Sequence, residues 1–164
     1  MLANCAVINA GPLVALSLAD RLDLLQALFG EFWIPEPVYH EVTVAGWGRP
    51  GAETLAAPDW LYRVREAPSS DPLLIAELDP GEAAVISLAR SIPSAMVVID
   101  EKRGRRVARQ VYDLTVKGTA GLLVEANRRG MVKDLRSVLV DLRQNGYYLS
   151  DAVIEGACAA ALRA

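Results

Sequence analysis

Short apolar segments that end on a polar residue recur along the chain, and segments with a helical pattern separate them. Residues 95–100, AMVVID, form the clearest such segment, and residues 6–9, AVIN, form another. A continuous apolar run is typical of a strand buried on both faces, because a strand with one face in water alternates apolar and polar residues. Such strands alternating with helices predict an α/β fold, a three-layer α/β/α sandwich around a central parallel sheet.

The remaining elements follow from the same patterns. Three more strands are expected, at residues 31–35, 60–66 and 114–118. Helices are expected at residues 12–19, 20–30, 36–46, 71–78, 79–91 and 101–111, and the C-terminal third is expected to be entirely helical, at residues 119–130, 132–146 and 150–164. Asp20 and Gly30 are the expected caps of the second helix. Residues 47–59 are expected to form a loop with one helical piece.

Size and composition indicate one soluble domain, residues 1–164. The chain has 164 residues, of which 52% are hydrophobic and 23% charged, enough to bury a core of its own. Its net charge of −3 creates no overall basic field that would attract nucleic acid. No apolar run approaches the roughly 20 residues that span a membrane. There is no basic region before the first apolar run, and the two cysteines suit a reducing compartment. We therefore expect a cytoplasmic protein that does not bind membranes.

Four polar residues are expected near the carboxyl ends of the strands, where open parallel sheets bind their ligands. Asn9 and Asp100 are the last residues of two predicted strands. Glu82 lies in the first turn of a predicted helix, and Glu41 lies on the helix that follows residues 31–35. These residues are far apart in the sequence, so only the fold can bring them together.

Each of these residues also has a local explanation. Glu82 follows Asp79 by three positions and can complete a capping box with it. Asp100 is placed to cap the helix that follows it. Glu41 is typical of a solvated helix residue, and Asn9 can satisfy its own turn. Composition and spacing alone therefore support only an α/β domain with acidic residues at strand ends.

Six segments share their pattern with one known family, in order and over nearly the whole chain. They are INAGPLVALSLADRLDLL (8–25), FGEFWIPEPVYHEV (29–42), LDPGEAAVISLA (78–89), VVIDEKRGRRVA (97–108), VKGTAGLLVEANRRG (116–130) and LVDLRQNGYYLSDAVIE (139–155). Through them the chain resembles the PIN-domain family, in the branch of predicted toxins of the VapC type. The resemblance implies a parallel sheet between helices and the activity of a metal-dependent ribonuclease.

The resemblance also implies a site. It places the four acidic positions of the family, as catalytic residues, on Asn9, Glu41, Glu82 and Asp100. It further implies a Mg²⁺ or Mn²⁺ ion held by oxygen ligands, here Asn9, Glu82, Asp100 and Glu101. Asn9 departs from the aspartate expected in active members. Its amide oxygen can coordinate a metal, but it carries no charge and cannot act as a base.

Basic residues crowd the predicted helix at residues 101–111, which begins directly after Asp100. They are Lys102, Arg103, Arg105, Arg106 and Arg109. Such a cluster neutralises phosphates, so we expect it to contact RNA beside the metal. Thr119 stands where relatives place a further polar residue, and we group it with this surface. The alternative is a solvated helix face with ion pairs to Glu101 or Asp113.

The expected function is that of an endoribonuclease, the toxin of a toxin–antitoxin pair, whose small antitoxin protein covers the acidic site. Asn9 keeps a second hypothesis open, a PIN-fold module that binds RNA or a protein with little or no catalysis. A nucleotide-binding domain of another class is a third, although no glycine-rich phosphate loop follows a strand. His40 is the one histidine, which excludes a histidine pair as acid and base. Members of the family often dimerise, so the apolar helix at residues 152–162 is either core or the interface of a homodimer.

Overall fold

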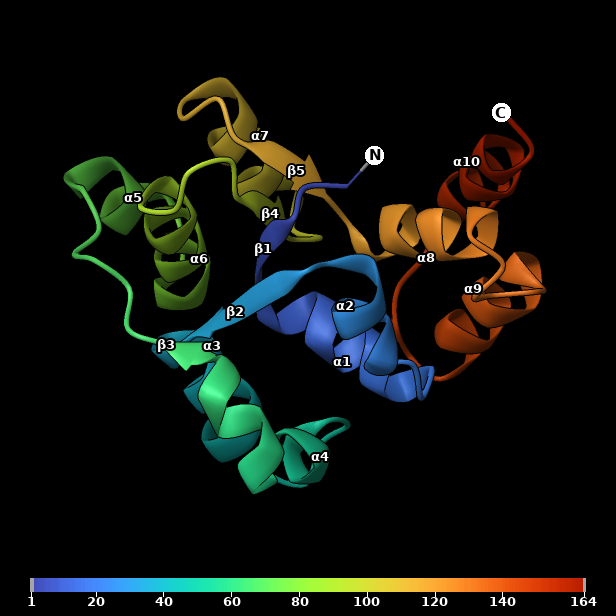
Figure 1. Cartoon of the computed structure of the whole chain (residues 1–164), viewed down its shortest axis with the longest axis horizontal. Coiled ribbons are helices and arrows are strands. Elements are labelled where there is room, and N and C mark those ends of the chain that lie inside the picture. Colours follow the sequence, from blue (N-terminus) through green and yellow to red (C-terminus); the bar gives the residue numbers. More distant parts are fainter. Residues whose placement is uncertain (1, 164) are drawn as a thin grey trace.

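The computed structural model describes residues 2–163 and places five parallel strands in one sheet (Figure 1). The strands are β1 (Cys5–Ile8), β2 (Glu31–Pro35), β3 (Val64–Arg65), β4 (Met96–Val98) and β5 (Thr115–Lys117). Their order across the sheet is β3-β2-β1-β4-β5, and every neighbouring pair is parallel. The predicted central parallel sheet is confirmed.

Helices connect the strands and form the C-terminal third. Those before β4 are α1 (Ala10–Leu18), α2 (Asp23–Leu28), α3 (Glu36–His40), the π-helical η1 (Glu41–Ala45), α4 (Ala52–Ala56), the 3-10 helix η2 (Pro58–Arg63), α5 (Pro72–Glu77) and α6 (Pro80–Arg90). Those after β4 are α7 (Lys102–Gln110), α8 (Thr119–Arg128), α9 (Leu135–Gln144) and α10 (Asp151–Ala161). Within residues 2–163, none of these helices combines the length and the hydropathy that a membrane crossing requires.

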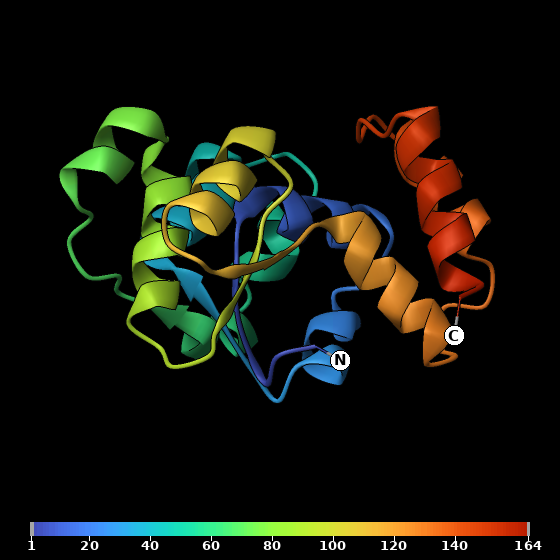
Figure 2. The same cartoon turned by 90° about the horizontal axis from the view of Figure 1, so that it is seen from above.

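The helices cover both faces of the sheet, which makes the fold the three-layer α/β/α sandwich that the sequence predicts. On one side α6 contacts β1, β2 and β4, and both α3 and α5 contact α6 (Figure 1). On the other side α2 contacts β2, and α1 contacts α8. The last two helices, α9 and α10, pack on α8 at one end of the molecule (Figure 2).

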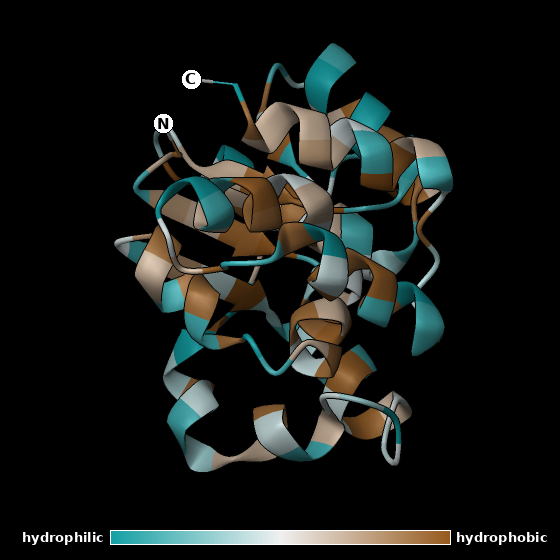
Figure 3. Cartoon of the chain, turned by 90° about the vertical axis from the view of Figure 1, so that its right-hand side faces the viewer, coloured by the Kyte–Doolittle hydropathy of each residue, from teal (hydrophilic) through white to brown (hydrophobic). Residues whose placement is uncertain are grey.

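The apolar runs of the sequence form the buried strands. Val7, Ile8, Val97 and Val98, from β1 and β4, have no exposed surface. Figure 3 shows the same arrangement, with hydrophobic segments in the interior and hydrophilic residues on the outer turns of the helices. Strands buried on both faces require apolar side chains at every position, which explains why these runs do not alternate.

The chain reverses its direction across the sheet between β1 and β4. From β1 it moves to β2 and β3 on one side, whereas β4 and β5 extend the sheet on the other side. Ile8 of β1 lies opposite Val98 of β4, so the residues that follow these two strands meet at one edge. A reversal of this kind opens a crevice at the carboxyl ends of the strands, which is where open α/β sheets bind ligands.

One predicted strand, at residues 60–66, is mostly helical. Residues Pro58–Arg63 form the 3-10 helix η2, and the strand is limited to Val64–Arg65. Three residues per turn place Trp60 and Arg63 on the same side of η2. The centres of the Trp60 and Phe32 rings lie 6.1 Å apart, and the Arg63 Cζ atom lies 4.2 Å from the centre of the Phe32 ring. Packing on β2 therefore favours the helical turn over the extended strand.

The second helix is shorter than its sequence pattern predicts. It covers Asp23–Leu28, and its C-cap is Phe29 rather than Gly30. Asp20 does not cap it. Asp20 follows α1 with a φ of 53°, the left-handed conformation in which many helices terminate. The helix predicted at residues 36–46 is present, but it continues from α3 into a π-helical turn at Glu41.

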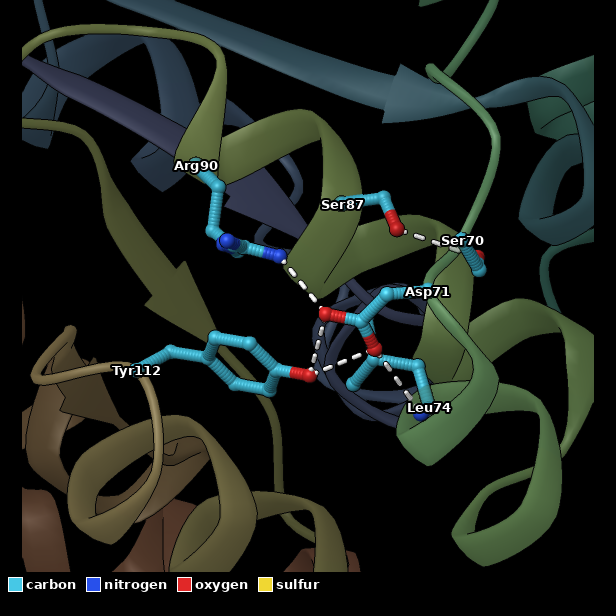
Figure 4. Close-up of polar contacts among 6 residues, drawn as sticks. All are labelled: Ser70, Asp71, Leu74, Ser87, Arg90 and Tyr112. Carbon is cyan, nitrogen blue, oxygen red and sulfur yellow. Dashed lines mark hydrogen bonds and ion pairs between the residues drawn. The ribbon is translucent and has the colours of Figure 1, made fainter.

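A cluster of polar contacts fixes the loop before α5 (Figure 4). The hydroxyl of Tyr112 donates to both carboxylate oxygens of Asp71, at 2.6 and 2.7 Å, and Arg90 forms an ion pair with the same carboxylate at 3.0 Å. The Arg90 guanidinium also lies 4.3 Å from the centre of the Tyr112 ring. Asp71 in turn accepts a hydrogen bond from the backbone N–H of Leu74, so it caps α5. The cluster joins the start of α5, the end of α6 and the turn that follows α7.

Candidate functional site

A cleft of about 1220 Å³ opens at the carboxyl ends of β1 and β4, the point at which the strand order reverses. Amide and carboxylate side chains at its wall come from Asn9, Glu41, Asp79, Asp100 and Glu101. Basic side chains at its wall come from Arg49, Lys102, Arg105, Arg109 and Lys117. The cleft therefore combines oxygen donors for a cation with positive charges for an anionic substrate.

Asn9 is the residue that links β1 to α1. Its backbone N–H continues the sheet by donating to the carbonyl oxygen of Val98, at 2.9 Å. The side chain is only 6% exposed, and its Oδ1 atom has no hydrogen-bond partner among the described residues. It also makes no capping bond to α1, so the structure does not support the local explanation of Asn9 as a turn-stabilising residue. A buried polar atom without a partner is costly, so in a native fold it calls for an explanation such as a bound water or ion.

Asp100 follows β4 and is held by three donors. Its Oδ1 atom accepts the backbone N–H of Thr119 at 2.7 Å, and its Oδ2 atom accepts the Thr119 hydroxyl at 2.6 Å. The hydroxyl of Tyr147 also donates to Oδ2. Asp100 does not cap the next helix, because the N-cap of α7 is Glu101, which makes no side-chain capping bond. The carboxylate is therefore fixed at the junction of β4, β5 and α8.

Gly118 explains why the backbone passes so close to this carboxylate. A Cβ atom at Gly118 would lie 2.8 Å from Asp100 Oδ1 and 3.0 Å from Arg105 Nη1. Any larger residue would displace the carboxylate, the guanidinium or the start of α8. The same geometry shows that the Arg105 side chain points toward the Asp100 end of the cleft.

Glu82 lies deeper than the other acidic residues and is not part of the cleft wall. Its backbone N–H donates to Asp79 Oδ1 at 2.8 Å, so half of the capping box predicted from the sequence is present. The side chain is 8% exposed, and Oε2 lies 2.8 Å from the point where a Cβ atom at Gly104 would be. Burial raises the pKa of Glu82 to about 8, and the neighbouring charges of Asp79 and Glu101 add to this effect.

Glu41 is the first residue of the π-helical turn η1 and lies at the cleft wall. The Thr43 hydroxyl donates to the carbonyl oxygen of Tyr39 at 2.7 Å, beside the point where the α-helix becomes π-helical. The Glu41 Oε2 atom lies 3.0 Å from the Cβ position of Gly81, at the start of α6. Partial burial and the charge of Asp79 raise the pKa of Glu41. Glu41 is exposed, as expected of a solvated helix residue, but the fold also brings it toward Asp79 at the cleft wall.

The predicted metal ligands do not form a compact acidic cluster. Within residues 2–163, no group of three or more His, Cys, Asp and Glu side chains is placed to hold a metal ion. Two oxygens at adjacent strand ends still have acceptor capacity: Asn9 Oδ1, which is buried and has no partner among the described residues, and Asp100 Oδ1, which accepts one hydrogen bond. Mg²⁺ keeps several water ligands and binds proteins through one or two side chains. The donor set therefore fits a largely hydrated Mg²⁺ or Mn²⁺ ion.

The basic residues of α7 separate into two groups. Lys102, Arg105 and Arg109 line the cleft. Arg103 instead pairs with Glu77 at 2.5 Å, and Arg106 is exposed outside the cleft wall. Thr119, which the sequence groups with this surface, is 1% exposed and bonded to Asp100, so it is not available to RNA in this structure.

Several cleft residues were not anticipated from the sequence. Arg49 and Lys117 add positive charge, and Tyr147 reaches Asp100 from the loop between α9 and α10. Burial, with the charge of Asp100, raises the pKa of Tyr147, so its hydroxyl stays protonated and remains a donor. Tyr147 lies 47 residues beyond Asp100, and no local pattern marks such a contact.

The comparison with known families gave one match. A family model described as a PIN domain matches residues 5–162, which covers every element of the sheet and the cleft. Neither the curated proteins nor the solved structures gave a match to the chain.

Proposed function

The chain belongs to the PIN-domain family, and on that premise we propose that it is a divalent-metal-dependent endoribonuclease acting in the cleft at the ends of β1 and β4. PIN domains are generally nucleases. The observation that carries the proposal is the buried Oδ1 atom of Asn9, which has no partner within residues 2–163 and lies at the strand end next to that of Asp100. An unpaired oxygen at the reversal point of the sheet is suited to a cation.

Asn9 and Asp100 would hold the ion through one oxygen each, and water would supply the other ligands. A bound Mg²⁺ or Mn²⁺ ion would lower the pKa of one of its waters and neutralise charge on the scissile phosphate. Glu41 lines the same cleft with a raised pKa, which makes its carboxylate a stronger base than an ordinary glutamate. We assign to it the role of accepting the proton of the attacking water.

RNA would enter along the basic wall of the cleft. Lys102, Arg105 and Arg109 line the cleft from α7, and Arg49 and Lys117 line it from other parts of the chain. These charges would neutralise backbone phosphates on both sides of the reacting bond. They also explain how a chain with a net charge of −3 can bind a polyanion, because the positive charge is concentrated in the cleft.

The biological role that we propose is that of the toxin in a toxin–antitoxin pair. This part of the proposal rests on the resemblance to the VapC-type branch. A small antitoxin protein would cover the cleft and keep the enzyme inactive. Expression of the chain alone should arrest bacterial growth, and the Asp100→Asn variant should not. Growth arrest by both proteins would show that the toxicity does not depend on this site.

One observation favours a second function, a PIN-fold module that binds RNA or a protein with little or no cleavage. Asn9 stands where active members are expected to carry aspartate, so the site has one negative charge less. A neutral ligand binds a cation less tightly. This alternative predicts RNA binding that is indifferent to EDTA.

Incubation of the purified chain with total RNA tests the proposal. Cleavage is expected with Mn²⁺ or Mg²⁺, and it should be lost with EDTA and in Asp100→Asn. Asp100→Asn removes one charge but preserves the size of the side chain, and circular dichroism checks that the variant is folded. Folded parent protein that binds RNA but does not cleave it would support the binding module. The variant Asn9→Asp would then test whether the missing charge is the cause.

A further inference from the structure

Tyr147 is not one of the family's acidic positions, but it contacts one of them, Asp100, directly. It belongs to the loop between α9 and α10, which Figure 1 shows as a ribbon. Its hydroxyl donates to Asp100 Oδ2. We propose that Tyr147 is a positioning residue, which together with Thr119 occupies Oδ2 and leaves Oδ1 as the oxygen of Asp100 that binds the cation. The inference rests on the proposed function.

The number of acceptor positions on the carboxylate supports this assignment. Each carboxylate oxygen can accept about two hydrogen bonds. Oδ2 receives two, from the hydroxyls of Thr119 and Tyr147, whereas Oδ1 receives one, from the backbone N–H of Thr119. One acceptor position therefore remains, and it is on Oδ1. Asp100 is thus prepared to bind an ion through a single oxygen.

The tyrosine is held in place by the elements around it. A Cβ atom at Gly11 would lie 3.5 Å from the Tyr147 hydroxyl oxygen and 3.6 Å from Asp100 Oδ2, so the first turn of α1 packs against this hydrogen bond. The backbone N–H of Tyr147 donates to the carbonyl oxygen of Leu142 at 3.0 Å. Two residues further, Leu149 is buried. The loop is therefore anchored on both sides of the ring.

This arrangement connects the C-terminal helices to the ion site. Asn9 directly precedes the turn of α1 that packs on the Tyr147 hydroxyl, and Asp100 accepts the hydrogen bond of that hydroxyl. A carboxylate whose rotamer is already fixed loses less freedom when it binds an ion. Partners that orient a metal ligand typically change metal affinity by about 10- to 100-fold when they are removed.

The neighbouring residue offers a matched control. Tyr148 also lies at the cleft wall, but it is 87% exposed, and none of the hydrogen bonds among the described residues involves its hydroxyl. Tyr147→Phe and Tyr148→Phe remove the same atom from adjacent positions. Their difference therefore measures the bond to Asp100 rather than the general effect of losing a phenol.

The experiment is calorimetric titration of Mn²⁺ into the full chain after removal of metals, without RNA. We expect the dissociation constant of Tyr147→Phe to be about tenfold higher than that of the parent, and that of Tyr148→Phe to be unchanged. Thermal unfolding without metal is measured in parallel. A purely structural role for Tyr147 would lower the unfolding midpoint but leave the Mn²⁺ affinity of the folded protein unchanged.

Each outcome bears on the inference. Equal Mn²⁺ affinity in the parent and Tyr147→Phe overturns it and leaves the metal-dependent nuclease in place. Equal weakening in both phenylalanine variants also overturns it, because the effect would not come from the bond to Asp100. A parent that binds no Mn²⁺ overturns both the inference and the metal-dependent function. If Tyr147→Phe does not fold, Thr119→Val removes the other hydroxyl from Oδ2, and unchanged Mn²⁺ affinity in that variant overturns the inference.

Discussion

Glu82 should make the stability of the protein depend on pH in an unusual direction. Its pKa is about 8 in the folded chain, against an ordinary value of 4.5, because the side chain is buried and lies near Asp79 and Glu101. A raised pKa means that folding favours the neutral form. The stabilisation is therefore fully present below pH 4.5 and is lost as the pH rises through 8.

The magnitude follows from proton linkage. Between pH 5 and pH 7 the folded chain holds the Glu82 proton and the unfolded chain has largely released it. The free energy of unfolding then falls by about 1.4 kcal/mol per pH unit, or about 2–3 kcal/mol over this interval. Glu82→Gln has no such proton. The free energy of unfolding of Glu82→Gln, minus that of the parent, should therefore be about 2–3 kcal/mol larger at pH 7 than at pH 5.

Urea denaturation at pH 5 and pH 7, with EDTA to exclude cations, measures this difference. Glu53→Gln is the control, because Glu53 also lies in the first turn of a helix but is exposed. The control should show no such gain. The reasoning is refuted if the free energy of unfolding of Glu82→Gln minus that of the parent is the same at both pH values, or if this difference decreases as the pH rises.

Three further predictions concern the cleft and its surroundings. Asn9→Asp should bind Mn²⁺ more tightly, by about tenfold, and should lower the metal-free melting temperature, because it adds a second charge near Asp100; calorimetry and thermal unfolding check both effects. Arg105→Ala should weaken RNA binding and reduce its salt dependence by about one phosphate contact, whereas Arg106→Ala should change neither, in filter binding at several salt concentrations. Tyr112→Phe removes both hydrogen bonds to Asp71, which does not line the cleft, so it should lower the urea midpoint slightly and leave RNA cleavage unchanged.

The sheet and two site residues were predictable because they depend on local pattern. The apolar runs at β1 and β4 are typical of strands buried on both faces, and the first polar residues after such strands, Asn9 and Asp100, are then expected at the carboxyl edge. The reversal of strand order between β1 and β4 then brings these two residues together.

The errors arose where tertiary packing decides the local structure. Residues 60–66 have the alternating pattern of a strand. Trp60 and Arg63 both contact Phe32, however, and residues three apart lie on the same side of the 3-10 helix η2 but not of a strand. Tyr147 and Tyr148 are chemically identical neighbours, and only the fold directs the first of them to Asp100. Contacts between residues that are far apart in the sequence cannot be recognised from a local sequence pattern.

The burial of individual side chains could not be predicted from the sequence either. Glu82 and Thr119 both start helices at the edge of the sheet, where a cleft position is the natural expectation. The structure buries them instead, Glu82 against Gly104 and Thr119 against Asp100. Glycines at positions 104 and 118 permit this close packing, and their role is visible only once the backbones are in place.

The central claim is that a divalent cation binds between the ends of β1 and β4. A crystal structure of the chain soaked in Mn²⁺, with anomalous scattering data, tests it most directly. The account predicts an anomalous peak in the cleft, within coordination distance of Asn9 Oδ1 and Asp100 Oδ1 and absent from Asp100→Asn crystals treated in the same way. A parent crystal with no peak in the cleft, or with a peak that persists in Asp100→Asn, would contradict it.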